Sequence, residues 1–100
     1  MAAVRKLDAI DDVIHQKVRL GVMSCLMAST EADFNFLKGA LGVSDGNLST
    51  HLTVLEESGY VAVRKEFVGK KPRTTYAPTP AGRRAFEEYV EALEAFVKGG

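Results

Sequence analysis

The most informative local pattern in the sequence is Val43-Ser44-Asp45-Gly46-Asn47-Leu48, which has the features of a capped helix start. Ser44 can accept a hydrogen bond from a free amide of the first helical turn. Val43 and Leu48, on either side of that cap, are spaced to form a hydrophobic staple, which sets the angle at which the chain enters the helix. Leu48, Leu52 and Leu55 then recur at helical spacing and are expected to face inward. Ser58-Gly59 ends the helix.

A shorter helix precedes this one, from about Phe34 to Leu41. Asp33 is its predicted N-cap, and Gly42 ends it as a residue that readily takes a positive φ. Two helices joined by a tight glycine-containing turn form a helix-turn-helix, which we place at about residues 34–58. An earlier helical signal, from about Ile14 to Ala28, completes a three-helix core, and residues 29–32 are predicted to be a connection.

The periodicity of the sequence changes after Gly59. Residues 60–67 and 74–77 are rich in β-forming side chains, and the segment between them contains a glycine and a proline. This pattern predicts a two-stranded hairpin with a basic tip at about residues 60–77, which in this position is a wing. The last helix, at about residues 80–97, begins with Thr79 as its cap and Pro80 in its first turn.

The predicted fold class is α+β, mainly α: a winged helix-turn-helix with a three-helix core, a two-stranded β wing and a long C-terminal dimerisation helix. A length of 100 residues accommodates a single domain, residues 1–100. The sequence has no apolar run long enough to span a bilayer and no secretory signal at its start. Its single cysteine, Cys25, fits a reducing compartment, so we expect a cytoplasmic protein.

The charged residues are distributed unevenly along the chain. The formal net charge is 0, which by itself argues against a nucleic-acid-binding protein. Residues 60–75, however, carry five basic side chains and one acidic one, whereas residues 21–59 carry five acidic side chains and one basic one. Such an asymmetry can make one face of a small domain basic, whatever its total charge.

Three stretches carry a resemblance to a known family: His15-Gln16-Lys17-Val18-Arg19-Leu20, the segment Leu48–Val61 with the pattern L-x-x-H-L-x-x-L-E-x-x-G-Y-V, and Thr79-Pro80-Ala81-Gly82-Arg83. In this order, and with a basic hairpin before the last stretch, the sequence resembles winged-helix transcriptional regulators of the MarR and ArsR type. It is most similar to a small single-domain MarR-like subgroup. The resemblance implies a homodimer that places the helix after Ser44 in the major groove of double-stranded DNA and the wing along a minor groove or the backbone.

The outward side chains of the helix after Ser44 are the candidates for contacting base edges. Asn47 has the donor and acceptor needed for a bidentate pair with adenine. The hydroxyls of Ser49, Thr50 and Thr53 can bond phosphates or bases, and the threonine methyls can contact thymine. The alternative is a solvated helix face with a capping asparagine, because this helix contains no arginine or lysine.

The wing carries the positive charge. Lys70, Lys71 and Arg73 are the candidate phosphate contacts, and Arg73 is also the candidate for entering a narrow minor groove. A solvated charged tip is the alternative. Arg64 and Lys65 point to opposite faces of a strand, so at most one of them joins the same patch.

No other chemistry is indicated. His51 lies among the leucines of its helix, where a structural contact between helices is favoured over a switch. His15 and Cys25 are too scattered to form a metal site with it, and Cys25 is expected in the core. We find no catalytic constellation and no phosphate-binding glycine loop, so we predict neither an enzyme nor a bound metal or cofactor.

The last helix raises the question of a partner. Its stripe contains more aromatic side chains than a small core needs, and an exposed apolar stripe predicts a second protein surface. We therefore expect a symmetric homodimer, with an interface formed by Ile14, Val18, Phe86, Tyr89, Val90, Leu93, Phe96 and Val97.

Together these features predict a sequence-specific regulator that binds double-stranded DNA as a dimer, most simply as a repressor that occupies a promoter. The alternative is a winged-helix module that binds protein, which the zero net charge and the non-basic helix keep open. A small-molecule effector could bind between the dimer helix and the core, although no cluster of polar residues identifies its chemistry.

Overall fold

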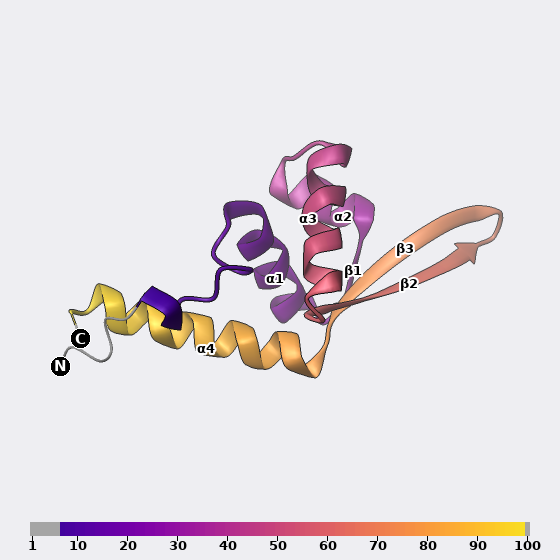
Figure 1. Ribbon diagram of the computed structural model, residues 1–100. Coiled ribbons are helices and arrows are strands. Elements are labelled where there is room, and N and C mark those ends of the chain that lie inside the picture. Colours follow the sequence, from indigo (N-terminus) through magenta and orange to yellow (C-terminus); the bar gives the residue numbers. More distant parts are fainter. Residues whose placement is uncertain (1–6, 100) are drawn as a thin grey trace.

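A three-helix core, a sheet and a long final helix follow one another along the chain (Figure 1). The computed structural model describes residues 7–99. Its helices and strands are η2 (Leu7–Ala9), α1 (Lys17–Ser29), β1 (Ala32–Asp33), α2 (Phe34–Leu41), α3 (Asp45–Glu57), β2 (Val61–Val68), β3 (Lys71–Pro78) and α4 (Pro80–Val97). The mainly helical winged helix-turn-helix predicted from the sequence is confirmed.

The predicted helix caps are present. Ser44 accepts a hydrogen bond from the amide of Asn47 at 3.1 Å, and Asp33 accepts one from Phe36 at 2.8 Å. Gly42, at the end of α2, has a φ of +65°. This left-handed conformation lets the chain turn sharply between α2 and α3, as glycine permits.

The first helix begins later than predicted. Helix α1 starts at Lys17 with Gln16 as its N-cap, whose side chain accepts from the amide of Arg19. The chain before it forms a separate turn, because Asp11 Oδ1 accepts from the amides of Val13 at 2.8 Å and Ile14 at 3.1 Å. Ile14 therefore reaches the core from a turn and not from the helix.

The sheet has one strand more than predicted. Its order is β1-β3-β2, with antiparallel pairing throughout, and the short strand β1 lies where a connection was predicted. The hairpin turn is also shorter than the six residues predicted. Lys71, Pro72 and Arg73 pair with Val68, Phe67 and Glu66, which leaves Gly69 and Lys70 as a two-residue turn, with Gly69 at a φ of +67°.

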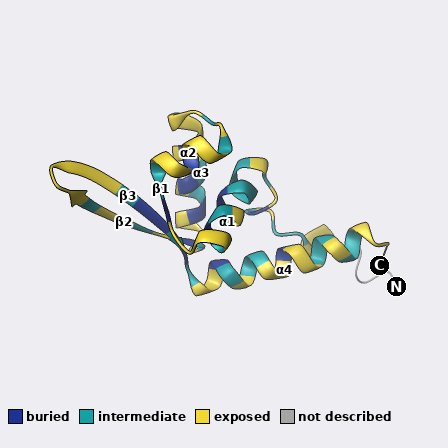
Figure 2. Ribbon diagram, turned by 180° about the vertical axis from the view of Figure 1, so that it is seen from behind, coloured by how far each residue is buried: buried dark blue, intermediate teal, exposed yellow. Residues whose placement is uncertain are grey.

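The core lies between the helices and the base of the wing, which is the hairpin β2–β3. Leu48, Leu52 and Leu55 face inward as predicted, with exposures of 0%, 2% and 0%. They pack in one cluster with residues from α1, α2, β2, β3 and α4, which include Val22, Leu26, Leu37, Val61, Tyr76 and Tyr89. The outer half of the wing and much of α4 lie outside this core (Figure 2).

A close backbone contact attaches α4 to the rest of the chain. Thr79 caps α4 by accepting from the amide of Gly82 at 2.9 Å, and its own amide donates to the carbonyl of Tyr60 at 3.0 Å. Its hydroxyl donates to the carbonyl of Gly59 at 2.6 Å. A Cβ atom on Gly82 would lie 2.1 Å from the Tyr60 carbonyl oxygen, so only glycine fits here. None of the described helices is both long and apolar enough to cross a membrane.

Candidate nucleic-acid interface

The exposed face of α3 presents small hydroxyl side chains. Ser49, Thr50 and Thr53 are all exposed, as expected from their spacing opposite the buried leucines. The Thr50 hydroxyl donates to the carbonyl of Gly46 at 2.9 Å, and the Thr53 hydroxyl donates to that of Ser49 at 3.0 Å. These bonds fix both threonine side chains and leave their oxygens free to accept, with their methyl groups beside them. We call these three residues the outer face of α3.

Asn47 lies at the edge of that face, toward α1. It borders a shallow hollow together with Lys17 of α1 and Leu41 of α2. Lys17 is exposed and brings a positive charge to the amino-terminal end of α3, a helix that has no basic residue of its own. Lys17 could not be predicted as a site residue from the sequence, because its distance from Asn47 depends on how α1 packs against the turn between α2 and α3.

A contact between α1 and α3 holds the interior side of α3. The Nη1 atom of Arg19 lies 3.0 Å from Nδ1 of His51, and Arg19 Nε donates to the carbonyl of Val13. Burial of the imidazole and the charge of Arg19 lower the pKa of His51 from its ordinary value of 6.5. His51 thus lies in a contact between two helices, as the sequence favoured.

The wing has two faces of different character, because side chains alternate along a strand. One face carries Lys65 and Phe67 on β2, opposite Thr74 and Pro72 on β3, and we call it the lysine face. The other carries Arg64, Glu66 and Val68, with Arg73 opposite Glu66 and Lys71 opposite Val68, and we call it the ion-pair face.

The arginines of the ion-pair face have acidic neighbours. Arg73 Nε lies 3.6 Å from Asp33 Oδ2, and Arg64 lies 3.4 Å from Glu31 and 3.6 Å from Glu66. Hydrogen bonding to Glu31, with the charges of Glu31 and Glu66, raises the pKa of Arg64. Asp33 is also the cap of α2, so the predicted minor-groove candidate Arg73 is drawn toward the base of the wing.

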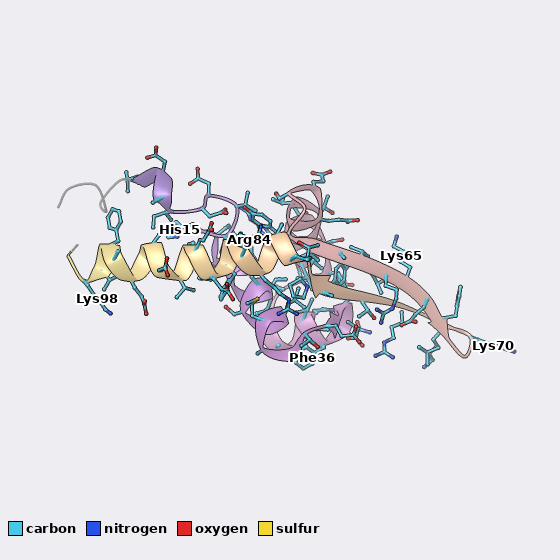
Figure 3. All side chains as sticks on the ribbon, turned by 90° about the horizontal axis from the view of Figure 1, so that it is seen from below. His15, Phe36, Lys65, Lys70, Arg84 and Lys98 are labelled. Carbon is cyan, nitrogen blue, oxygen red and sulfur yellow. The ribbon has the colours of Figure 1, made fainter. Side chains whose placement is uncertain are left out.

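The lysines of the wing have no such partners. Lys65, Lys70 and Lys71 are exposed, and no ion pair to a carboxylate is found for any of them within the described part of the chain. Lys70 forms the tip itself, and Figure 3 shows it at the far end of the hairpin. Lys70 and Lys71 are thus as accessible as predicted, and Lys65 is the member of the Arg64–Lys65 pair that is free.

Helix α4 carries a second surface, which is apolar. A groove lies between α4 and α1, and its lining includes Leu20, Phe86, Val90, Leu93 and Val97. Val97 is 79% exposed and Val90 37% exposed, although both are apolar. Acidic side chains border the groove on its other side, where they belong to Glu87, Glu91 and Glu94. We call this surface the α4 groove.

The remaining residues predicted for a dimer interface are placed differently. Ile14 is 0% and Tyr89 2% exposed, because both are part of the core of their own chain. They have almost no surface to offer a partner. The Tyr89 hydroxyl also lies 2.8 Å from His15 Nδ1. Val18 is half-buried beside the hollow that contains Asn47, and Phe96 is half-buried on α4.

Metal ligands are not gathered anywhere in residues 7–99: no three His, Cys, Asp or Glu side chains come close enough to hold an ion. Cys25 is half-buried and packs against the core. The distinctive surfaces of the described chain are therefore the outer face of α3, the wing and the α4 groove.

The comparisons with known proteins agree with this geometry. Residues 18–97 match the family described as the winged helix DNA-binding domain. An uncharacterised protein of Methanocaldococcus jannaschii is 35% identical over 78 residues, which are 78% of this chain and 85% of the relative. The solved structure of a transcriptional regulator homologue from Pyrococcus horikoshii is 30% identical and has a TM-score of 0.82, covering 89% of this chain and 88% of that chain.

The predicted likeness to MarR-type regulators is also confirmed at the level of the fold. A MarR-family regulator from Silicibacter pomeroyi is 21% identical with a TM-score of 0.67, covering 96% of this chain and 62% of that chain. The capped α3, the basic hairpin after it and the extent of the family match lead to one conclusion: this chain belongs to the winged helix DNA-binding domain family.

Proposed function

We propose that this protein is a sequence-specific regulator that binds double-stranded DNA as a homodimer and represses transcription by occupying a promoter. One observation carries the proposal: α3 presents a face of fixed hydroxyl side chains, and the wing beside it carries lysines without acidic partners. Membership of a DNA-binding family favours DNA over the protein-binding alternative.

The two surfaces have different roles in this proposal. Thr50 and Thr53 read base edges through their oxygens and methyl groups, with Ser49 beside them and Asn47 at the edge that faces α1. Lys65, Lys70 and Lys71 contact phosphates, and these contacts supply affinity with little dependence on sequence. Arg73 joins them only if the approach of DNA draws it away from Asp33.

The homodimer rests on the α4 groove. Phe86, Val90, Leu93 and Val97 form an apolar stripe along a helix that extends beyond the core (Figure 1). A second copy would cover this stripe, and two copies of α3 could then reach half-sites about one helical turn, ~34 Å, apart. Ile14 and Tyr89 are left out of this interface because they are buried in their own chain.

The DNA-binding part is tested with duplexes selected by the protein from a random-sequence library, with affinities measured by fluorescence anisotropy. The double variant Lys70→Glu/Lys71→Glu should bind every duplex more weakly. The double variant Thr50→Ala/Thr53→Ala should instead lose discrimination between selected and scrambled duplexes. Arg84→Glu is the matched control, because Arg84 is an exposed cation on α4 and not on the wing (Figure 3). Equal binding to selected and scrambled duplexes by the unmodified protein would refute sequence-specific recognition.

The dimer is tested separately by size-exclusion chromatography with light scattering. Val90→Glu places a charge in the α4 groove and should convert the dimer to a monomer, because an unpaired charge in an apolar interface is strongly unfavourable. Val68→Glu is the matched control, since Val68 is a 51% exposed valine on the wing. A monomeric unmodified protein, or the same effect from both variants, would refute this interface.

A further inference from the structure

The tip of the wing exposes an aromatic side chain. Phe67 is 74% exposed although it lies in the paired region of β2, where its cross-strand neighbour is Pro72. The ring and the proline are therefore side by side on the lysine face, two residues before the tip of the hairpin. Nothing in the described chain covers them.

The charged side chains on the face of Phe67 and at the adjacent tip are lysines. Lys65 shares its face and Lys70 lies in the adjacent turn, whereas Lys71 pairs with Val68 on the opposite face. The nearest carboxylate along β2 belongs to Glu66, which points to the opposite face and lies 3.6 Å from Arg64. An apolar ring between an unpaired lysine on its own face and another at the tip complements a polyanion better than it complements an ordinary protein surface.

The lysine face is also the side of the wing that continues toward α3. Its residues nearer the core are Val63 and Tyr76, which form a cross-strand pair and pack in or against the core. Burial, with the charge of Glu56 at the end of α3, raises the pKa of Tyr76. Figure 3 shows Lys65 projecting from this face, so a duplex lying against α3 would meet Lys65 and Phe67 before it met the ion-pair face.

We propose that Phe67 is an apolar wedge that enters the minor groove next to the major groove occupied by α3 and partly unstacks a flexible pyrimidine–purine step. Apolar side chains that enter a minor groove in this way kink the duplex, and Lys65 and Lys70 would contact the phosphates on either side of Phe67. The inference rests on the proposed function. It adds a preference that depends on how easily the DNA deforms, at a position where the protein reads no base edge.

Two duplexes of equal charge test the wedge. Alternating poly(dA-dT) is rich in flexible TpA steps, whereas poly(dA)·poly(dT) is a stiff A-tract. The unmodified protein should bind the alternating duplex more tightly, and Phe67→Ala should weaken that binding by roughly tenfold, within the range seen when a base loses an aromatic stacking partner. Binding of Phe67→Ala to the stiff duplex should stay the same. Val68→Ala on the opposite face is the control and should keep the preference, as should Phe67→Leu, which retains an apolar side chain.

A second measurement reports the unstacking itself. A 2-aminopurine placed at a TpA step should become brighter when the unmodified protein or Val68→Ala binds, and should stay quenched with Phe67→Ala. Equal affinity of the unmodified protein for the two duplexes, or a preference that survives in Phe67→Ala, overturns the wedge while DNA binding stands. Failure of the unmodified protein to bind either duplex overturns the wedge, and the proposed function falls with it only if the protein also fails to bind duplexes selected from the random library. If Phe67→Ala keeps the preference for the alternating duplex but changes the oligomeric state, Phe67 belongs to a protein contact, and this result also overturns the wedge.

Discussion

Replacing Gly82 with alanine tests how α4 is attached to the rest of the chain. The new Cβ would lie 2.1 Å from the carbonyl oxygen of Tyr60, 2.9 Å from its carbonyl carbon and 3.1 Å from its Cα. These are backbone atoms, so no side chain can rotate away. The start of α4 and the segment at Tyr60 must separate by about 1 Å to reach an ordinary contact distance.

This separation breaks or weakens two hydrogen bonds. The Thr79 amide donates to the Tyr60 carbonyl at 3.0 Å, and the Thr79 hydroxyl donates to the Gly59 carbonyl at 2.6 Å. Each such bond contributes about 1 kcal/mol, and forcing an extra methyl into a packed site costs a further 1–3 kcal/mol or so. Alanine regains about 1 kcal/mol through its better helix propensity. We therefore expect Gly82→Ala to lower the free energy of unfolding by about 3 kcal/mol.

Gly39→Ala is the matched control for this experiment. Gly39 lies in α2, and no heavy atom lies within 4 Å of the position its Cβ would take. The same substitution should therefore raise the free energy of unfolding by up to about 1 kcal/mol. Urea unfolding of both variants, at one protein concentration because a dimer's stability depends on concentration, measures the two values. The reasoning is refuted if Gly82→Ala is as stable as the unmodified protein or if both variants shift in the same direction.

The wing lysines and two titratable side chains, His51 and Tyr60, provide further predictions. If Lys65, Lys70 and Lys71 contact phosphates in both protomers, log affinity should fall with log salt at a slope of about −5. The double variant Lys70→Ala/Lys71→Ala should reduce the slope to about −2. An unchanged slope in an anisotropy titration would exclude Lys70 and Lys71 as phosphate contacts. Because burial and Arg19 lower the pKa of His51 below 6.5, this site should contribute its full stability above pH 6.5 and lose it as the pH falls through the lowered value. An NMR titration should show that Arg19→Met raises the pKa of His51, and an unperturbed pKa in the unmodified protein would contradict the contact. The hydrogen bond to Asp11, with burial, raises the pKa of Tyr60 from 10.0 to about 12. The stability that this hydrogen bond adds to the folded state should therefore be complete below pH 10 and disappear as the pH rises through about 12. Ultraviolet titration of the unmodified protein against Tyr60→Phe measures this, and ionisation of all tyrosines near pH 10 would contradict it.

The parts of the fold that depend on local sequence could be predicted. A cap and its amide lie three residues apart in the chain, so Ser44, Asp33 and Thr79 could be assigned without knowledge of tertiary structure. The same holds for the leucine stripe of α3 and for Gly42, whose positive φ is a property of one residue. The helix-turn-helix and the wing follow directly from these signals.

The parts that depend on contacts between distant segments could not be predicted. The ion pair of Arg73 with Asp33 joins residues forty positions apart, and it depends on the pairing of β1 with β3. A two-residue strand carries no periodicity, so β1 looked like a connection. The turn at Asp11 likewise buries Ile14 in the core of its own chain, whereas we had expected it in the dimer interface.

The ion-pair face neutralises the charge of the two wing arginines with carboxylates of the same chain. Glu31, Asp33 and Glu66 lie beside the two wing arginines in the free protein, as salt ions would otherwise do. If the protein binds DNA as proposed, unrelated sequence would gain two more cationic contacts per protomer only by displacing these carboxylates, and its binding would be weakened by that cost. Because a genome offers an enormous excess of unrelated sites, weak adhesion shortens each unproductive encounter and frees the protein to continue its search. Under the proposed function, this protein would therefore reach its target site mainly through rapid dissociation from unrelated sequence.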